Sequence, residues 1–494
     1  MNCSEISNKR ISCREFPFFH NRKLTIFDTR TFNQRTIFAY LSVSFVYKRN
    51  EKGENMAKKT LQDKVYGRKI HKPNKFLYWL IYILGKLVYK KKYGMRFNFV
   101  DDPRKEEGPV IVIANHASRN DYLFVGIPLY PIRFNFVAGY NEFFRINLSL
   151  LFRTMQLIPK RQYYEDSYTV MEILRSIRQN KNSVCFYPEG LSSISGANQP
   201  SVPGTGKLLK LLKVPVYSVV TKGSYLIMPK YKFGHKERYA HTETTIKKAF
   251  SVEDLKNMSA EEIESKVDGI LYQDDYEWAQ DNHIVYKDNK EGIAEDLEGL
   301  LFRCPRCGHD FEIETKGNTI KCKHCGNEAY INNDYTIHPK SKEDKIPTTQ
   351  KKWFDLERIE IRKEIDNNPD YVFEVETTLG VFPKNKLLKF GKTALIAGKG
   401  KLILSKKDGF SYIGTMNGKP YEMHVPNLNM YTFVMCYGPK IIHFFYQGEL
   451  RQFTFAQYGM ATKVLLIQNE IHRSVGGKWQ MLKNFKYDES ECFK

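Results

Sequence analysis

The sequence predicts an α/β domain with a mostly parallel sheet, followed by a small cysteine module and a C-terminal β-rich domain. Between residues 105 and 250, apolar β-branched runs alternate with stretches of helical pattern, which favours parallel strands joined by helices. Two Cys-x-x-Cys pairs follow between residues 301 and 333. From about residue 370, short alternating runs recur with turn signals such as Asn417-Gly418, which is typical of antiparallel hairpins.

Length and charge indicate how many domains the chain has and what kind of partner it binds. A chain of 494 residues is expected to fold as about two to four domains. Its net charge of +22 indicates an anionic partner, either nucleic acid or an anionic membrane surface. We favour anionic phospholipid and expect no nucleic acid, because the charges flank apolar aromatic segments and no nucleic-acid-binding motif occurs. Five of the nine cysteines are scattered, so we expect a reducing cytosolic compartment rather than a disulfide framework.

The first 104 residues divide at Met56. Residues 1–55 lack sustained periodicity, so we expect translation to begin at Met56 and residues 1–55 to be a disordered or artefactual extension. Residues 56–104 are expected to be a membrane-associated helical segment. The aromatic run at 76–89 is too short to span a bilayer and precedes Lys90-Lys91-Lys92, which fits a helix lying in the membrane interface. The alternative is a helix that docks on the next domain, and both can hold at once.

Two motifs at strand ends carry candidate chemistry. The strand-like run Val110–Ala114 ends in Asn115-His116-Ala117-Ser118-Arg119-Asn120-Asp121, and a His and a carboxylate at this spacing predict a general base and its orienting residue. A second run, Val184–Tyr187, ends in Pro188-Glu189-Gly190. Ser118 and Ser192 are the nucleophiles that a rival covalent mechanism would use, but neither lies in a Gly-x-Ser-x-Gly pattern.

Together the motifs NHxxxxD and PEG resemble the glycerophosphate acyltransferase superfamily, especially the 1-acylglycerol-3-phosphate acyltransferases, over roughly residues 75–245. The resemblance implies that His116 is the catalytic base, that Asp121 orients it, and that Asn115, Glu189 and Gly190 belong to the substrate site. Family members also carry an Arg, after a strand between the motifs, that binds the acceptor phosphate. Arg161 stands at that place, and a guanidinium suits bidentate phosphate binding.

One departure from the family concerns the acceptor. The family usually has Thr-Arg-Ser after PEG, where this chain has Leu191-Ser192-Ser193, so that a common phosphate ligand is missing. Lys207 and Lys210 are candidates to compensate for it. The missing Arg puts the lysophosphatidic-acid acceptor in doubt more than the reaction type.

The resemblance implies a peripheral enzyme on the cytoplasmic face of the cell membrane. It would transfer an acyl chain from acyl-CoA or acyl-carrier protein to a lysophospholipid hydroxyl, first of all that of 1-acylglycerol 3-phosphate. The alternative is a non-catalytic membrane lipid-binding scaffold. The intact His116, Asp121 and Glu189 argue against a scaffold, which needs none of them. The sequence identifies no protein partner.

Residues 301–338 are expected to be a zinc ribbon. Cys304 and Cys307 form one Cys-x-x-Cys knuckle, Cys322 and Cys325 the other, and four thiolates suit a tetrahedral structural Zn²⁺. Each pair is followed by a glycine, which a tight knuckle turn needs for positive φ. The pattern resembles a rubredoxin-like ribbon. Iron is the minor alternative, and a redox dithiol is less favoured because two such pairs together favour a metal.

The remaining segments complete the predicted order. Residues 251–300 are acidic and helical, with capping boxes at Ser251/Asp254 and Ser259/Glu262, and close a predicted acyltransferase domain at 105–300. Residues 339–369 are expected to be a linker. Residues 370–480 are expected to form antiparallel strands closed by a helix near 456–473, a pattern similar to pleckstrin-homology-like barrels.

Overall fold

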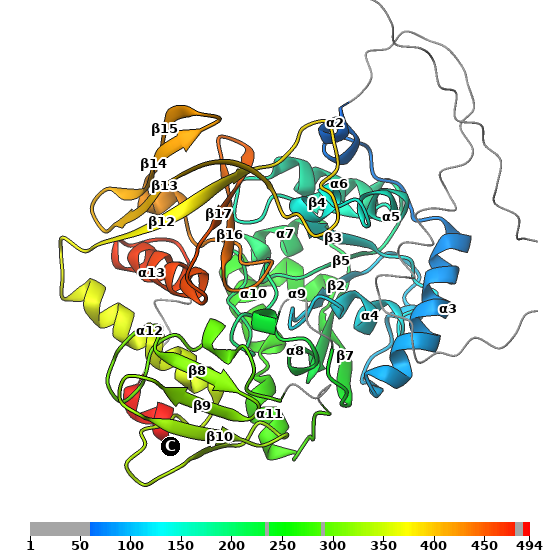
Figure 1. Cartoon of the computed structure of the whole chain (residues 1–494). Helices are drawn as coiled ribbons and strands as arrows, with labels where there is room; N and C mark the ends of the chain where they lie inside the picture. The colour runs from blue at the N-terminus through cyan, green and yellow to red at the C-terminus, as the bar shows by residue number, and fades with distance from the viewer. Residues whose placement is uncertain (1–59, 233–236, 288–291, 480–487) are drawn as a thin grey trace, which may run out of the picture.

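The computed structural model describes residues 60–232, 237–287, 292–479 and 488–494. The predicted extension at 1–55, and with it the Met56 start, lies outside these residues. Figure 1 shows a central sheet flanked by helices, a small sheet at the lower end and a C-terminal sheet at the upper left. None of the helices in the described residues is long and apolar enough to cross a bilayer.

The central sheet has the strand order β1-β7-β6-β2-β5-β3-β4. Its strands are β1 (Met95–Phe99), β2 (Ile111–Ala114), β3 (Asn135–Gly139), β4 (Ile158–Lys160), β5 (Val184–Phe186), β6 (Val216–Lys222) and β7 (Thr242–Phe250). Neighbouring strands run parallel, except that β7 is antiparallel to β6. The predicted mostly parallel sheet is therefore confirmed.

Helices cover both faces of this sheet, because the apolar residues of β2 point alternately to the two sides. Ile111 and Ile113 pack with α6, α7 and α10, whereas Val112 and Ala114 pack on the other face with α4. The helices and 3-10 turns of this region are α2 (Leu61–Val65), α3 (Lys75–Lys92), η1 (Pro103–Lys105), α4 (Asp121–Gly126), η2 (Tyr140–Phe144), α5 (Ser149–Thr154), α6 (Ser167–Arg178), α7 (Thr205–Leu212), α8 (Ser224–Ile227), η3 (Lys230–Lys232), α9 (Val252–Asn257), α10 (Ala260–Leu271), α11 (Asp275–Asp281) and η4 (Leu297–Gly299).

Both predicted capping boxes are confirmed. The Ser251 side chain accepts from the backbone N–H of Asp254 at the start of α9, and the Asp254 carboxylate accepts in return from the Ser251 backbone. Ser259 and Glu262 make the same reciprocal pair at the start of α10. Each box satisfies N–H groups that have no partner within the helix, which is why both helices begin where the sequence predicts.

The cysteine module is a small antiparallel sheet with the order β11-β10-β9-β8. Its strands are β8 (Ile313–Lys316), β9 (Thr319–Cys322), β10 (Glu328–Ile331) and β11 (Ile337–Pro339). Strands β8 and β9 form an antiparallel hairpin between the two Cys-x-x-Cys pairs.

The segment 339–369, predicted to be a linker, instead contains the helix α12 (Gln350–Asp366). The helix is capped by the Thr349 side chain and buries Trp353, Phe354 and several aliphatic residues. The sequence did not show a clear apolar face for this helix, because two charged residues lie on its inner side. Arg358 and Arg362 pair with the buried carboxylate of Glu470. The linker prediction is therefore wrong over this helix.

The C-terminal region is an antiparallel sheet with the order β15-β14-β13-β12-β17-β16, closed by α13 (Met460–Ser474). Asn417 and Gly418 have φ of 54° and 79° between β14 and β15, so the predicted hairpin is confirmed. The likeness to a pleckstrin-homology barrel stays a prediction. The strands and turns are β12 (Val372–Val381), β13 (Leu395–Ser405), β14 (Gly409–Met416), β15 (Lys419–Val425), η5 (Asn427–Asn429), β16 (Ile441–Tyr446) and β17 (Glu449–Thr454), with η6 (Glu489–Phe493) at the end.

Candidate active site

His116 and Asp121 face each other where β2 ends and α4 begins. The loop between these elements brings His116 Nδ1 to 2.8 Å from Asp121 Oδ2. The Asp121 side chain is 4% exposed and the His116 side chain is 23% exposed. The structure thus brings together the two residues predicted to be base and orienter, with the imidazole on the more open side.

Ser118 and Ser224 fix the Asp121 carboxylate. The backbone N–H of Ser118 donates to both carboxylate oxygens at 3.0 and 2.9 Å, and its hydroxyl donates to Oδ1 at 2.8 Å. The Ser224 hydroxyl adds a longer contact of 3.3 Å. These donors fix the position of the Asp121 carboxylate, which in turn orients the imidazole of His116 through Nδ1. Nε2 of His116 receives no hydrogen bond from any described residue and is left to accept a proton from a bound hydroxyl.

The Pro188-Glu189-Gly190 turn at the end of β5 holds the His116 loop in place. Glu189 Oε1 accepts from the His116 backbone N–H at 2.7 Å, and the backbone N–H of Ser193 donates to the His116 carbonyl at 2.6 Å. Asn198 and Gln199 donate to the two oxygens of Glu189. Burial raises the pKa of Glu189 to about 8, although these hydrogen bonds act in the opposite direction. The contacts give Glu189 the geometry of a brace for His116.

Gly190 is required by the backbone of this turn. Its φ is +71°, and a Cβ there would lie 2.9 Å from Val202 Cγ2. The Gly190 carbonyl accepts from the Gln162 side chain at 2.7 Å, and the Tyr163 hydroxyl donates to the Glu189 carbonyl at 3.0 Å. The loop that carries Arg161 therefore packs directly against the turn.

Two further contacts define the surroundings of His116. The Tyr187 ring stacks on the imidazole with 4.4 Å between centroids, so it fixes the plane of the ring. Asn115 hydrogen-bonds in both directions to the backbone of Thr221 at 2.8 Å, which ties the end of β2 to the end of β6. The Asn115 amide thus serves the backbone, and its substrate contact stays a prediction.

Arg161 lies at the edge of the site, among aromatic rings. Its guanidinium stands 4.1 Å from the centroid of Tyr66 and 6.0 Å from that of Phe445, on β16 of the C-terminal sheet. Its Nε is buried and has no hydrogen-bond partner among the described residues. No described hydrogen bond links its side chain to His116 or Glu189, so its role as a phosphate ligand also stays a prediction.

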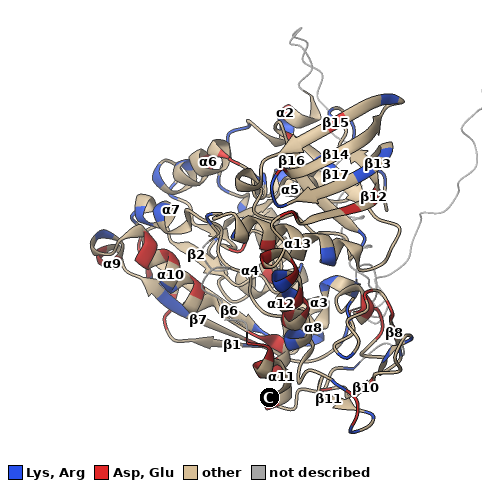
Figure 2. Cartoon of the chain, turned by 90° about the vertical axis from the view of Figure 1, so that its left-hand side faces the viewer, with Lys and Arg blue, Asp and Glu red and all other residues tan. Residues whose placement is uncertain are grey.

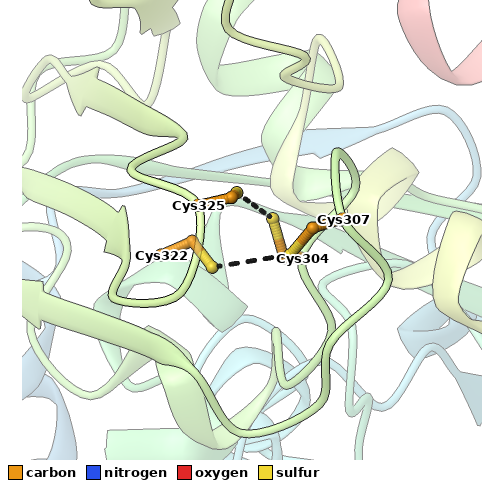
Figure 3. A group of neighbouring side chains, drawn as sticks. All are labelled: Cys304, Cys307, Cys322 and Cys325. Carbon is orange, nitrogen blue, oxygen red and sulfur yellow. Dashed lines mark hydrogen bonds between the residues drawn. The ribbon is translucent and has the colours of Figure 1, made fainter.

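The four predicted metal ligands converge in the cysteine module (Figure 3). Cys304 Sγ lies 3.6 Å from Cys325 Sγ, and Cys307 Sγ lies 3.8 Å from Cys322 Sγ. All four sulfurs lie within 4.8 Å of one another. A regular tetrahedron with Zn–S bonds of about 2.3 Å has sulfurs roughly 3.8 Å apart, so the set fits a closed tetrahedral site. Gly308 and Gly326 have φ of 73° and 76°, as the knuckle turns were predicted to require.

Residues 96–222 match the family model described as Acyltransferase. This acyltransferase region contains β2 to β6, β1 without its first residue, and every residue of the His116 site described above except Ser224 and the aromatic neighbours Tyr66 and Phe445. Among solved structures, the 1-acyl-sn-glycerophosphate acyltransferase of Thermotoga maritima is similar, with 18% identity and a TM-score of 0.33, over 40% of this chain and 77% of that one. Among curated proteins, none matches this chain. The family model thus supports the predicted acyltransferase resemblance over residues 96–222.

Sequence reasoning missed most of the supporting residues of the site. Tyr187 directly precedes the PEG motif, and Asn198 and Gln199 follow it by eight and nine positions, but no spacing rule predicts that they contact the site. Ser118 was weighed as a nucleophile, whereas its hydroxyl donates to Asp121. Lys230 has no motif signal at all, and it reaches the site only because α8 and η3 fold back over the PEG turn.

Proposed function

We propose that this chain moves a fatty acyl group from acyl-CoA or acyl-carrier protein to the free hydroxyl of a lysophospholipid in phospholipid synthesis. The first acceptor to consider is 1-acylglycerol 3-phosphate. The observation that carries the proposal is the pair of His116 and Asp121, 2.8 Å apart and braced by Glu189, within the acyltransferase region.

In the proposed reaction, the acceptor hydroxyl is the nucleophile. Neutral His116 takes the hydroxyl proton on Nε2 while the oxygen attacks the thioester carbonyl. Asp121 stabilises the imidazolium that forms, in the manner of a serine-protease triad without its serine. The C–O bond then forms as the C–S bond breaks, and the thiolate takes the proton from His116. Ser118 is assigned to hold Asp121, and no acyl-enzyme is needed.

The substrate site proposed around this pair uses the residues of the family resemblance. Arg161 would bind the acceptor phosphate through its guanidinium, whose buried Nε has no partner among the described residues. Gly190 would let the backbone approach the ligand closely, and Glu189 would keep the His116 loop in register. Asn115, at the end of β2, would belong to the substrate-binding residues.

The decisive experiment is an acyl-transfer assay with purified protein. Acyl-CoA and acyl-carrier protein would each be offered with a panel of lysolipids, and the product would be identified by mass spectrometry. We expect turnover with at least one glycerophosphate acceptor. No turnover on any acceptor, with vesicle binding intact, would favour the lipid-binding scaffold instead.

We also propose that Cys304, Cys307, Cys322 and Cys325 hold a structural Zn²⁺. Four thiolates leave no open position on the metal, so its role would be to fold the module rather than to act on substrate. The module adjoins α12, where the Trp353 indole donates to the Arg303 carbonyl at 2.9 Å, next to Cys304. The ion would therefore also fix the position of α12 against the cysteine module.

A peripheral location on the membrane is proposed from α3. Its inner face docks on α4, where Gly85 lies against Leu123 and Ile127. Its outer face exposes Phe76 and Leu87 at 67% and 71%, with Trp79 beside them and three lysines at its end. Acidic residues lie on other elements, among them α10 and α11 (Figure 2). An apolar stripe ending in cations suits the cytoplasmic face of an anionic bilayer.

The double substitution Phe76→Glu and Leu87→Glu is expected to release the protein from vesicles. Burying a large apolar side chain contributes about 1.5–3 kcal/mol, so the membrane partition constant should fall at least tenfold. Sedimentation with vesicles of anionic phospholipid measures this. Tyr330→Glu, at a 49% exposed position on β10, serves as the control away from α3. Equal sedimentation of the double variant and the wild type would exclude α3 as the membrane contact.

A further inference from the structure

Lys230 is a buried cation beside the PEG turn that the mechanism above does not use. It follows α8 and is 7% exposed. Its ammonium donates to the Ser192 carbonyl at 2.5 Å. No Asp or Glu among the described residues forms an ion pair with it. A buried ammonium with one carbonyl partner has two further N–H donors and no ion-pair partner among the described residues, so it can bind an anion.

The surroundings of Lys230 are cationic. A small cavity of about 20 Å³ lies between the His116 loop and η3, with Arg119 and Lys232 also on its wall. The described residues that line it include no Asp or Glu, and they are Ala117, Ser118, Arg119, Ser192, Met228, Pro229, Lys230 and Lys232. The volume suits one water-sized group, and hence one phosphate oxygen rather than a whole phosphate.

Ser192, which lines this cavity, stands where the resembled family has a phosphate ligand. In the resembled family, the residue at this place after PEG is an Arg that binds phosphate, and this chain lacks it. Of the two lysines considered as substitutes, Lys210 points away, since its ammonium donates to the carbonyls of Lys256 and Met258. Lys207 is exposed on α7. Lys230 alone among these three contacts residue 192.

We propose that Lys230 replaces the missing Arg: its ammonium, held against Ser192 and beside the His116 loop, binds the phosphate of the acceptor and selects phosphorylated lysolipids. The proposal rests on the acyltransferase function proposed above. Burial lowers the pKa of Lys230 to about 7, with Arg119 acting in the same direction and Cys436 and Glu189 against it. A bound phosphate would favour the charged form.

The test compares Lys230→Met with Lys230→Arg in the full chain. Loss of a charge-assisted hydrogen bond should raise KM for 1-acylglycerol 3-phosphate roughly 10- to 100-fold in Lys230→Met, whereas Lys230→Arg should keep most of the affinity. Adding Ser192→Arg to Lys230→Met should recover the low KM, because it restores the cation at the place where the family has it. Lys207→Met is the matched control and should leave KM unchanged.

Separate measurements identify the source of the phosphate. With 1-acylglycerol, which has no phosphate, Lys230→Met should not alter the rate. A rise in KM for the acyl donor instead of the acceptor would assign Lys230 to the phosphates of the donor and overturn the proposal. So would an unchanged acceptor KM in Lys230→Met.

Stability separates a binding role from a structural one. Removing a buried charge that has no carboxylate partner should raise the melting temperature of Lys230→Met while its acceptor affinity falls. If the wild type has no turnover, the proposed function fails, and the thermal shift caused by glycerol 3-phosphate still tests Lys230. A shift present in the wild type and lost in Lys230→Met supports the inference, and equal shifts overturn it.

Discussion

Replacing His116 with Ala is expected to lower kcat for acyl transfer by roughly 10²–10⁴-fold, because the acceptor hydroxyl loses its general base. The Nδ1 side of the imidazole is occupied by Asp121 at 2.8 Å, so proton transfer falls to Nε2 alone. The His116 side chain is partly exposed and makes no other side-chain hydrogen bond among the described residues, so the variant should fold. Steady-state kinetics with the best acceptor of the panel would measure the effect.

A second His–Asp pair supplies the control. His283 Nδ1 lies 3.6 Å from Asp334 Oδ2 on the surface, and the His283 side chain is 82% exposed. His283→Ala should therefore leave kcat unchanged. Turnover in His116→Ala equal to that of the wild type would exclude His116 as the base. A loss in both variants would point to a general effect on the fold.

Ser118→Ala distinguishes direct attack by the acceptor from a covalent mechanism. In the structure the Ser118 hydroxyl donates to Asp121. Ser118→Ala should therefore remove one hydrogen bond to a charged group, which contributes about 1.5–3 kcal/mol, and turnover should fall only in part. A covalent mechanism through Ser118 would instead abolish turnover as fully as His116→Ala does. Mass spectrometry of the protein after incubation with the acyl donor alone would then detect an acyl-enzyme.

The elements that the sequence predicted correctly are those determined by residues close to one another along the chain. Strands β2, β5 and β6 are short apolar runs because both faces of the sheet are buried. The caps of α9 and α10 and the turn at Asn417-Gly418 depend on residues within four positions of each other. α12 escaped prediction because Arg358 and Arg362 face inward toward Glu470, more than a hundred residues away.

The same distinction holds for the candidate site. His116 and Asp121 are five positions apart and joined by one loop, so their spacing predicted their contact. Glu189 reached the prediction through the family motif, and its bond to the His116 backbone spans 73 positions. Lys230 contacts Ser192 only because the chain after β6 returns over the PEG turn, and no pattern in the sequence encodes that return.

The largest expected effect on stability is that of removing the Zn²⁺ proposed for the cysteine module. Binding of a structural Zn²⁺ to four thiolates contributes on the order of 10–16 kcal/mol, which is as large as the total stability of a typical domain. Cys322→Ser, at a fully buried position, should therefore lose the metal and unfold β8 to β11. Elemental analysis of the wild type should find one zinc per chain, and visible absorbance would reveal iron in its place.

Trp353 is a local reporter of this unfolding. Its indole is 1% exposed and donates to the carbonyl of Arg303, the residue before Cys304, so loss of the knuckle should expose it and shift its fluorescence to longer wavelength. Chelation of the wild type should give the same shift. Cys492→Ser, a buried cysteine outside the cluster that also packs near α12, is the matched control and should keep both metal and emission. A protein free of zinc and iron with native Trp353 emission would contradict the metal site, and it would leave the four sulfurs as a packed thiol cluster.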